Sequence, residues 1–167
     1  MTDNNNNKNT RTISVLVDNE PGVLSRVTGL FSGRVFNIES LSVAPTTDAT
    51  VSRITLLTSG SPAIVEQIIK QLRKLINVIK VSDLTDTKFV QREMALIKVR
   101  ADAASRAEIL RIVDIFRCKV VDVAHHNYTI EVTGAEGKIE ALLDLLSNFG
   151  LEEIVRTGKV AIARSRK

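Results

Sequence analysis

The stretch Asp18-Asn19-Glu20-Pro21-Gly22-Val23-Leu24 lies between a strand pattern and a helix pattern, and it is the most informative feature of the chain. Ahead of it, residues 12–17 alternate polar and β-branched side chains, which predicts a strand. Behind it, apolar residues recur at the spacing of one helix face as far as Phe31. The turn therefore places the N-terminus of a helix at the end of a strand.

A helix N-terminus at the end of a strand is a favourable place for a small anion. Its first backbone N–H groups have no partner within the helix, and the helix dipole attracts negative charge. Gly22 has no Cβ, so a ligand can approach the backbone, and the Asn19 amide both donates and accepts hydrogen bonds. The loop thus has groups for the carboxylate and the ammonium of a free amino acid, although the same residues also suit an ordinary turn.

The same order of elements occurs twice along the chain. In the first half we expect strands at 13–17, 36–43, 51–58 and 78–81, and helices at 23–31 and 62–75. Ser61 and Pro62 suit the start of the second helix as N-cap and first helical residue. In the second half we expect strands at 94–99, 119–124, 128–132 and 151–155, with 160–163 as an extension, and helices at 103–116 and 135–149. The pattern predicts an α+β protein of two tandem ferredoxin-like βαββαβ units, each an antiparallel sheet with its helices on one face.

The boundaries follow from composition. Residues 1–11 are Asn-rich and read as a disordered leader, 12–84 form the first domain, and 85–91 are a polar linker. Residues 92–167 form the second domain, whose basic end we expect to be a solvated tail. The topology leaves one face and the edges of each sheet open, and exposed edges favour pairing, so we expect a homodimer.

Composition narrows the functional classes. The net charge of +4 over 167 residues is mild and gives no reason to expect nucleic acid as a partner. No apolar run approaches a membrane span, and no signal peptide is evident, so we expect a cytoplasmic protein without a membrane partner. The single cysteine, Cys118, lies beside two valines and suits a small apolar role.

Other functions of ferredoxin-like proteins fit this sequence less well than amino-acid binding does. The strands at 13–17 and 51–58 have no aromatic residue on which an RNA base could stack, and the first loop has no paired cysteines for a metal. An acylphosphatase-like enzyme would need an arginine in that loop, whereas Arg26 lies one turn inside the helix. The adjacent His125 and His126 suit turn residues rather than paired ligands. We therefore expect no catalytic residue and no metal site.

Several longer segments of the sequence resemble one known protein family. The run from Ile13 to Ser32, ISVLVDNEPGVLSRVTGLFS, resembles the start of an ACT domain, a small regulatory module that binds amino acids. FNIESLSVAP (residues 36–45), SRIT (52–55) and QREMALIK (91–98) resemble one ACT family, the small regulatory subunit of acetolactate synthase. Gly137-Lys-Ile139 and Arg156-Thr-Gly158 continue the similarity into the second half.

The resemblance implies a non-catalytic partner of a large subunit that carries thiamine diphosphate, FAD and magnesium, while this chain carries no cofactor. It also implies activation of that subunit and feedback inhibition by valine or another branched-chain amino acid. The implied effector site lies between two paired ACT domains. One chain supplies the first loop and the other supplies the start of the second strand; the residues concerned are Asn19, Gly22, Val23, Leu24, Asn37 and Ile38.

One position departs from the family pattern. The family usually has a glycine just before the aromatic-Asn-Ile run, and here that residue is Val35, with Gly33 two positions earlier. A β-branched residue resists a left-handed turn, so we expect Gly33 to end the helix and the affinity for the effector to be altered. The alternative reading is a stand-alone ACT-type sensor that controls another enzyme or a transcriptional response.

Overall fold

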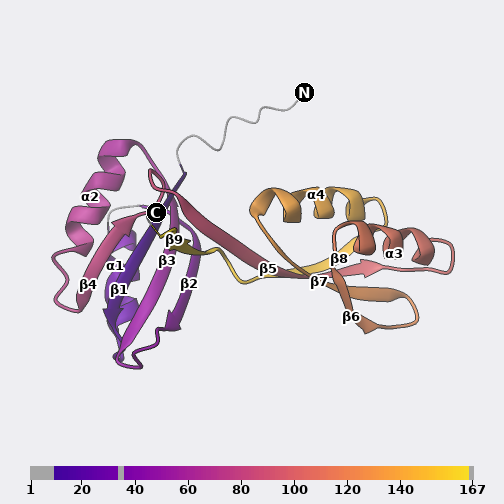
Figure 1. Cartoon of the computed structure of the whole chain (residues 1–167), viewed down its shortest axis with the longest axis horizontal. Helices are drawn as coiled ribbons and strands as arrows, with labels where there is room; N and C mark the ends of the chain where they lie inside the picture. Colours follow the sequence, from indigo (N-terminus) through magenta and orange to yellow (C-terminus); the bar gives the residue numbers. More distant parts are fainter. Residues whose placement is uncertain (1–9, 34–35, 166–167) are drawn as a thin grey trace. The chain divides into compact units, whose positions relative to one another are not determined.

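The first unit is a four-stranded antiparallel sheet with two helices on one face. The computed structural model describes residues 10–33 and 36–165 (Figure 1). Its first elements are β1 (Thr10–Asp18), α1 (Val23–Ser32), β2 (Ile38–Pro45), β3 (Val51–Ser59), α2 (Pro62–Leu72) and β4 (Val78–Asp83). The strand order β2-β3-β1-β4 is that of a ferredoxin-like unit, as the sequence predicts. At the start of α2, Ser61 Oγ accepts a hydrogen bond from the N–H of Ile64, and Pro62 follows it, which confirms the predicted cap.

The alternation of β1 builds the core of this unit. Ile13, Val15 and Val17 point toward the helices and are almost fully buried. They pack with apolar residues of β3, β4, α1 and α2, namely Ile54, Leu56, Val81, Val23, Val27, Phe31, Val65, Ile68 and Leu72. Since these residues recur at strand or helix spacing, the pattern of the sequence was enough to locate the core.

The second unit repeats the topology. Its elements are β5 (Phe89–Arg100), α3 (Arg106–Ile115), β6 (Lys119–Val123), β7 (Asn127–Gly134), α4 (Glu136–Ser147) and β8 (Leu151–Arg156), with strand order β6-β7-β5-β8. Cys118 packs against its core, and burial raises the pKa of the thiol, as suits an unreactive apolar residue. In the part of the chain that the structure describes, no helix is long and apolar enough to cross a membrane.

An ion pair holds β8 against the second unit. The guanidinium of Arg156 makes two bonds of 2.8 Å to the buried carboxylate of Glu93 and one of 2.7 Å to the exposed Glu140. Glu93 first, and then Glu140, raise the pKa of Arg156 above its usual value, against the effect of burial. The pairing satisfies a charge that would be costly to bury alone.

The end of the chain covers part of the outer face of the first sheet, opposite the helices. The last strand, β9 (Val160–Ala163), pairs with β5, and its residues group with the first unit (Figure 1). The N–H of Lys159 donates to Ser40 Oγ at 3.0 Å, and the N–H of Arg164 donates to the carbonyl of Lys88. We call residues 159–164 the C-terminal strap. Beneath it, Ser14 and Thr55 are buried even though they face away from the helices.

Three of the expected boundaries differ in the structure, one of them because of the strap. Of the residues that the structure describes, those up to Gln91 and those from Lys159 onward form the first unit, and residues 92–158 form the second, so the strap does not belong to the second domain. Lys159 is buried, so the expectation of a solvated tail is wrong there, because the strap packs on the sheet. At the other boundaries β1 already begins at Thr10, and β5 begins at Phe89, within the expected linker. Residues 1–9 of the expected leader lie outside the described residues.

Two substitutions on the strap test this packing. Ala161 is 6% exposed and Ile162 is 60% exposed, so Ala161→Asp buries a charge whereas Ile162→Asp does not. We expect Ala161→Asp to lower the free energy of unfolding by about 2–4 kcal/mol and Ile162→Asp to change it by less than about 0.5 kcal/mol. Denaturant unfolding followed by circular dichroism measures the difference, and amide hydrogen exchange in β1 and β3 assigns it to the first unit. Equal effects of the two variants would mean that the strap does not pack on this sheet.

Candidate functional site

The loop between β1 and α1 has the geometry that the sequence predicts. Gly22 is the N-cap of α1, and its backbone lies in the left-handed region, with φ +83°. A Cβ built at Gly22 would meet no atom within 4 Å, so the requirement for glycine comes from the backbone conformation and not from crowding. The same absence of neighbours leaves the backbone open to a ligand.

Asn19 fixes the loop to the neighbouring turn. Its Nδ2 donates to the carbonyl of Ala49 at 2.9 Å, and its Oδ1 accepts from Ser52 Oγ at 3.0 Å. Its backbone N–H donates to the carbonyl of Thr50. Both ends of the amide are therefore engaged, and Asn19 holds the loop in place instead of presenting a free side chain.

Asn77 is a second anchor, which the sequence analysis missed. Its Nδ2 donates to the carboxylates of Asp18 and Glu20, and its Oδ1 accepts a 2.6 Å bond from Arg26. Its carbonyl also accepts the N–H of Asp18. Asn77 lies between α2 and β4, far from the loop in sequence, and only its polar character beside an apolar strand could have marked it.

The two units differ at the N-termini of their first helices. None of the described residues caps α1 with a side chain, and the first turn of α1 has no acidic residue. At α3 the carboxylate of Asp102 accepts bonds from the N–H and the hydroxyl of Ser105, which lower the pKa of Asp102. An anion is therefore favoured at α1, whereas a carboxylate of the chain itself already lies at α3.

The apolar candidates divide into two kinds. Val23 is 3% exposed and belongs to the core, and its backbone N–H makes a long bond of 3.4 Å to the carbonyl of Glu20. Leu24 is 41% exposed and can contact a ligand. Ile38 is partly buried and packs against the same core, with part of its side chain still accessible.

Within one chain, the loop and the start of β2 lie at opposite ends of the sheet. Ile38 pairs with Thr58, which pairs with Arg11, whereas the loop begins after Asp18, which pairs with Val51. Seven residues of β1 separate these two levels, and at about 3.3 Å per residue the separation is about 23 Å. The exposed side chain of Asn37, whose carbonyl accepts from Thr58 Oγ1, therefore cannot share a small ligand with the loop of its own chain.

The helix stop before β2 is at the expected residue. Gly33 is the C-cap of α1, and its N–H donates to the carbonyl of Gly29. Its φ of −67° is right-handed, so Gly33 itself does not adopt the left-handed conformation. Val35, the residue that departs from the family pattern, lies outside the described residues.

Comparisons with known proteins agree with this fold. Residues 13–80 match the family model described as an AHAS small subunit-like ACT domain, so the first unit is an ACT domain. Residues 92–165 match the model described as the small subunit of acetolactate synthase. The chain belongs to the family of acetolactate synthase small subunits, which confirms the resemblance found in the sequence.

Individual relatives match along nearly the whole chain. A probable acetolactate synthase small subunit of Archaeoglobus fulgidus is 51% identical over 156 residues, covering 93% of this chain and 98% of that protein. The acetolactate synthase small subunit of Aquifex aeolicus is 53% identical over 153 residues, covering 91% of this chain and 80% of that protein. The crystal structure of the small subunit from Thermotoga maritima has a TM-score of 0.87 at 42% identity, covering 95% of this chain and 99% of that one.

Two glycines of the same region provide a stability test. Gly22→Ala forces a left-handed backbone on a residue with a Cβ, and we expect it to cost about 1–2 kcal/mol. Gly29 lies inside α1 with open space around it, so Gly29→Ala should stabilise the protein by about 0.5–1 kcal/mol. Urea unfolding followed by circular dichroism measures both variants. Stabilisation by Gly22→Ala would contradict the assigned loop conformation.

Proposed function

We propose that this chain activates the catalytic large subunit of acetolactate synthase and makes it sensitive to feedback inhibition by valine or another branched-chain amino acid. The observation that carries the proposal is the uncapped N-terminus of α1, with Gly22 in a left-handed conformation beside it. The large subunit would hold the thiamine diphosphate, FAD and magnesium, and this chain would act in the cytoplasm without a cofactor of its own.

The candidate residues would share the binding of the amino acid by chemical type. The backbone N–H of Leu24 would bind the carboxylate, joined by the N–H of Val23 if the ligand displaces its 3.4 Å bond to the carbonyl of Glu20. The side chains of Leu24 and, from a second copy, Ile38 would contact the branched apolar group. Asn37 of the second copy would supply hydrogen bonds, while Asn19 would keep the loop in its binding conformation.

A second copy is part of the proposal because one chain separates the two halves of the site. β2 is an edge strand, so it is free to pair with β2 of another copy. Across a two-fold axis the two β2 strands run antiparallel, which brings the loop end of one sheet to the level of Asn37 in the other. Such a dimer would carry two equivalent effector sites.

Regulation would follow from the position of the ligand between two chains. A ligand that touches both copies favours one relative placement of the copies over another. It can shift the population of active complexes only as far as its affinities for the two placements differ. The dimer without the amino acid would hold the large subunit in its active arrangement, and the bound amino acid would favour a different one.

Reconstitution with a matched large subunit tests the function directly. Acetolactate formation is measured with the large subunit alone, with this chain, and with this chain plus valine, leucine or isoleucine. We expect activation by the chain and inhibition by at least one amino acid. Gly22→Asp places a negative charge at the helix end, so it should remove inhibition and keep activation, whereas the control Gly29→Ala should keep both. Amino-acid binding without any effect on the large subunit would instead indicate a stand-alone sensor.

A mixed dimer tests whether the site spans two chains. Gly22→Asp inactivates the loop half and Asn37→Ala weakens the β2 half, so each variant alone should lose sensitivity to the amino acid by at least about tenfold. In a mixed dimer, the intact loop of the Asn37→Ala chain meets the intact β2 start of the Gly22→Asp chain and forms one complete site. Co-expression with two tags isolates this dimer, and we expect it to regain part of the inhibition. A mixed dimer as insensitive as both parents would contradict a shared site.

A further inference from the structure

The outer face of the first sheet carries two cations at one level. Arg53 on β3 pairs with Leu16 on β1, and Leu16 pairs with Lys80 on β4. Since directly paired residues point to the same face, Arg53 and Lys80 lie on either side of Leu16, with backbones about 10 Å apart. Ser14 and Ser82, themselves paired, lie at the next level on the same face. The effector loop contributes none of these residues.

These residues line a pocket of about 230 Å³. Its walls are Ser14, Leu16, Arg53, Lys80, Ser82 and Leu84 of the sheet and its margin, and Ile162 and Ala163 of the C-terminal strap. Among these lining residues there is no Asp or Glu, so the charges in the pocket are both positive. Polar groups in it are hydrogen-bond donors or hydroxyls, and a site of this composition complements an anion.

The guanidinium of Arg53 is only partly used within the described residues. It donates one bond of 3.0 Å to Ser14 Oγ, and no carboxylate of the described residues pairs with it. Arginine has five N–H donors, so most of this half-buried group is available to a ligand. Because Ser14 accepts the bond from Arg53, its own hydroxyl hydrogen is free to point into the pocket.

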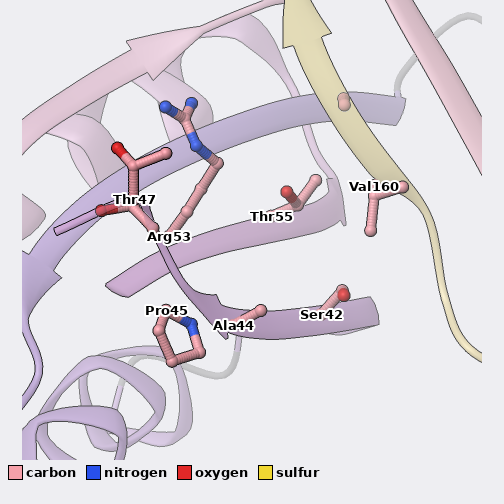
Figure 2. A pocket seen from close by; sticks show the side chains of 9 residues that line it. Ser42, Ala44, Pro45, Thr47, Arg53, Thr55 and Val160 are labelled. Atoms are coloured by element: carbon pink, nitrogen blue, oxygen red, sulfur yellow. The ribbon is translucent and has the colours of Figure 1, made fainter. Parts of the chain in front are cut away.

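Arg53 also borders a second pocket on the other side of the strap. This pocket, of about 300 Å³, is lined by Ser42, Ala44, Pro45, Thr46, Thr47, Arg53, Thr55, Val160 and Ala161. Figure 2 shows Arg53 extending from β3 over the sheet, with Ser42 and Ala44 on β2 and Val160 on β9. The residues that line this second pocket include several with hydroxyl groups. None of these lining residues is acidic. Arg53 is therefore a lining residue of both pockets.

We propose that Arg53 and Lys80, with the hydroxyls of Ser14 and Ser82, form a binding site for a small oxyanion, a phosphate or carboxylate group. Arg53 supplies directed N–H donors, and Lys80 supplies a second charge from the opposite wall. The strap closes one side of the site through Ile162 and Ala163, so a bound anion lies against both the sheet and the strap. The site is separate from the α1 N-terminus, and its existence does not depend on the proposed function.

Titration with inorganic phosphate and with acetate at constant ionic strength tests the site. The full chain is labelled with ¹⁵N, and we expect saturable shifts of the amide signals of β1, β3, β4 and the strap. Arg53→Gln and Lys80→Gln should each weaken binding by about tenfold or more, since each removes a charged hydrogen-bond donor. The matched control Lys74→Gln removes an exposed charge at the end of α2 and should leave the affinity unchanged. Tighter binding of phosphate would identify a phosphoryl ligand, and equal or tighter binding of acetate would identify a carboxylate.

Two further measurements keep the result unambiguous. Because Arg53 also bonds Ser14, its replacement could disturb the fold, and circular dichroism with thermal unfolding establishes whether Arg53→Gln is folded. Lys80 is exposed, so Lys80→Gln tests the site without this structural effect. Gly22→Asp repels anions from α1 and should not change phosphate binding at Arg53. Shifts confined to the α1 loop, equal loss in Lys74→Gln, or no saturation with either anion would each overturn the proposal.

Discussion

The pairing of β1 on both of its edges is the constraint on which the first unit depends. β1 pairs with β3 over its whole length, from Thr10 to Asp18, and with β4 on the other side. Because its side chains alternate between the faces, this register directs Ile13 and Val15 into the core and Ser14 and Leu16 to the opposite pocket. The end of β1 at Asp18 then places the α1 loop. The core, the loop and the outer pocket therefore share one register, and a slip of one residue would exchange the two faces.

The two units show how one topology can differ at the helix N-terminus that follows its first strand. Both have the same strand order, and both place a helix directly after their first strand. In the first unit that helix begins with a left-handed glycine and no side-chain cap, whereas Asp102 lies at the corresponding turn of the second. A single carboxylate thus distinguishes a helix end that attracts an anion from one that is already satisfied. The fold alone would not have separated them.

Local pattern predicted most of this molecule, and long-range contacts account for what it missed. Strands, helices and both cores follow from apolar spacing, and the placement of a helix N-terminus after β1 follows from the change of pattern at residues 18–24. The roles of Ser52 and Asn77 could not be predicted from local pattern, because each residue bonds the loop from more than thirty residues away. Val23 was assigned to the ligand as well as to a helix stripe, and burial places its side chain in the core. The strap was missed because no local signal shows which sheet face a short C-terminal strand will cover.

The strap also sets the order in which the protein can be completed. Lys159 bonds to Ser40, 119 residues earlier in the chain. The ribosome makes the first unit first, yet the outer face of its sheet stays uncovered until the second unit and the residues after it have been synthesised. Contacts between residues this far apart in sequence form slowly, because a long loop must close before they stabilise anything. The unit that begins the chain is therefore the last to be finished, and an interrupted translation product would expose the face on which Arg53 lies.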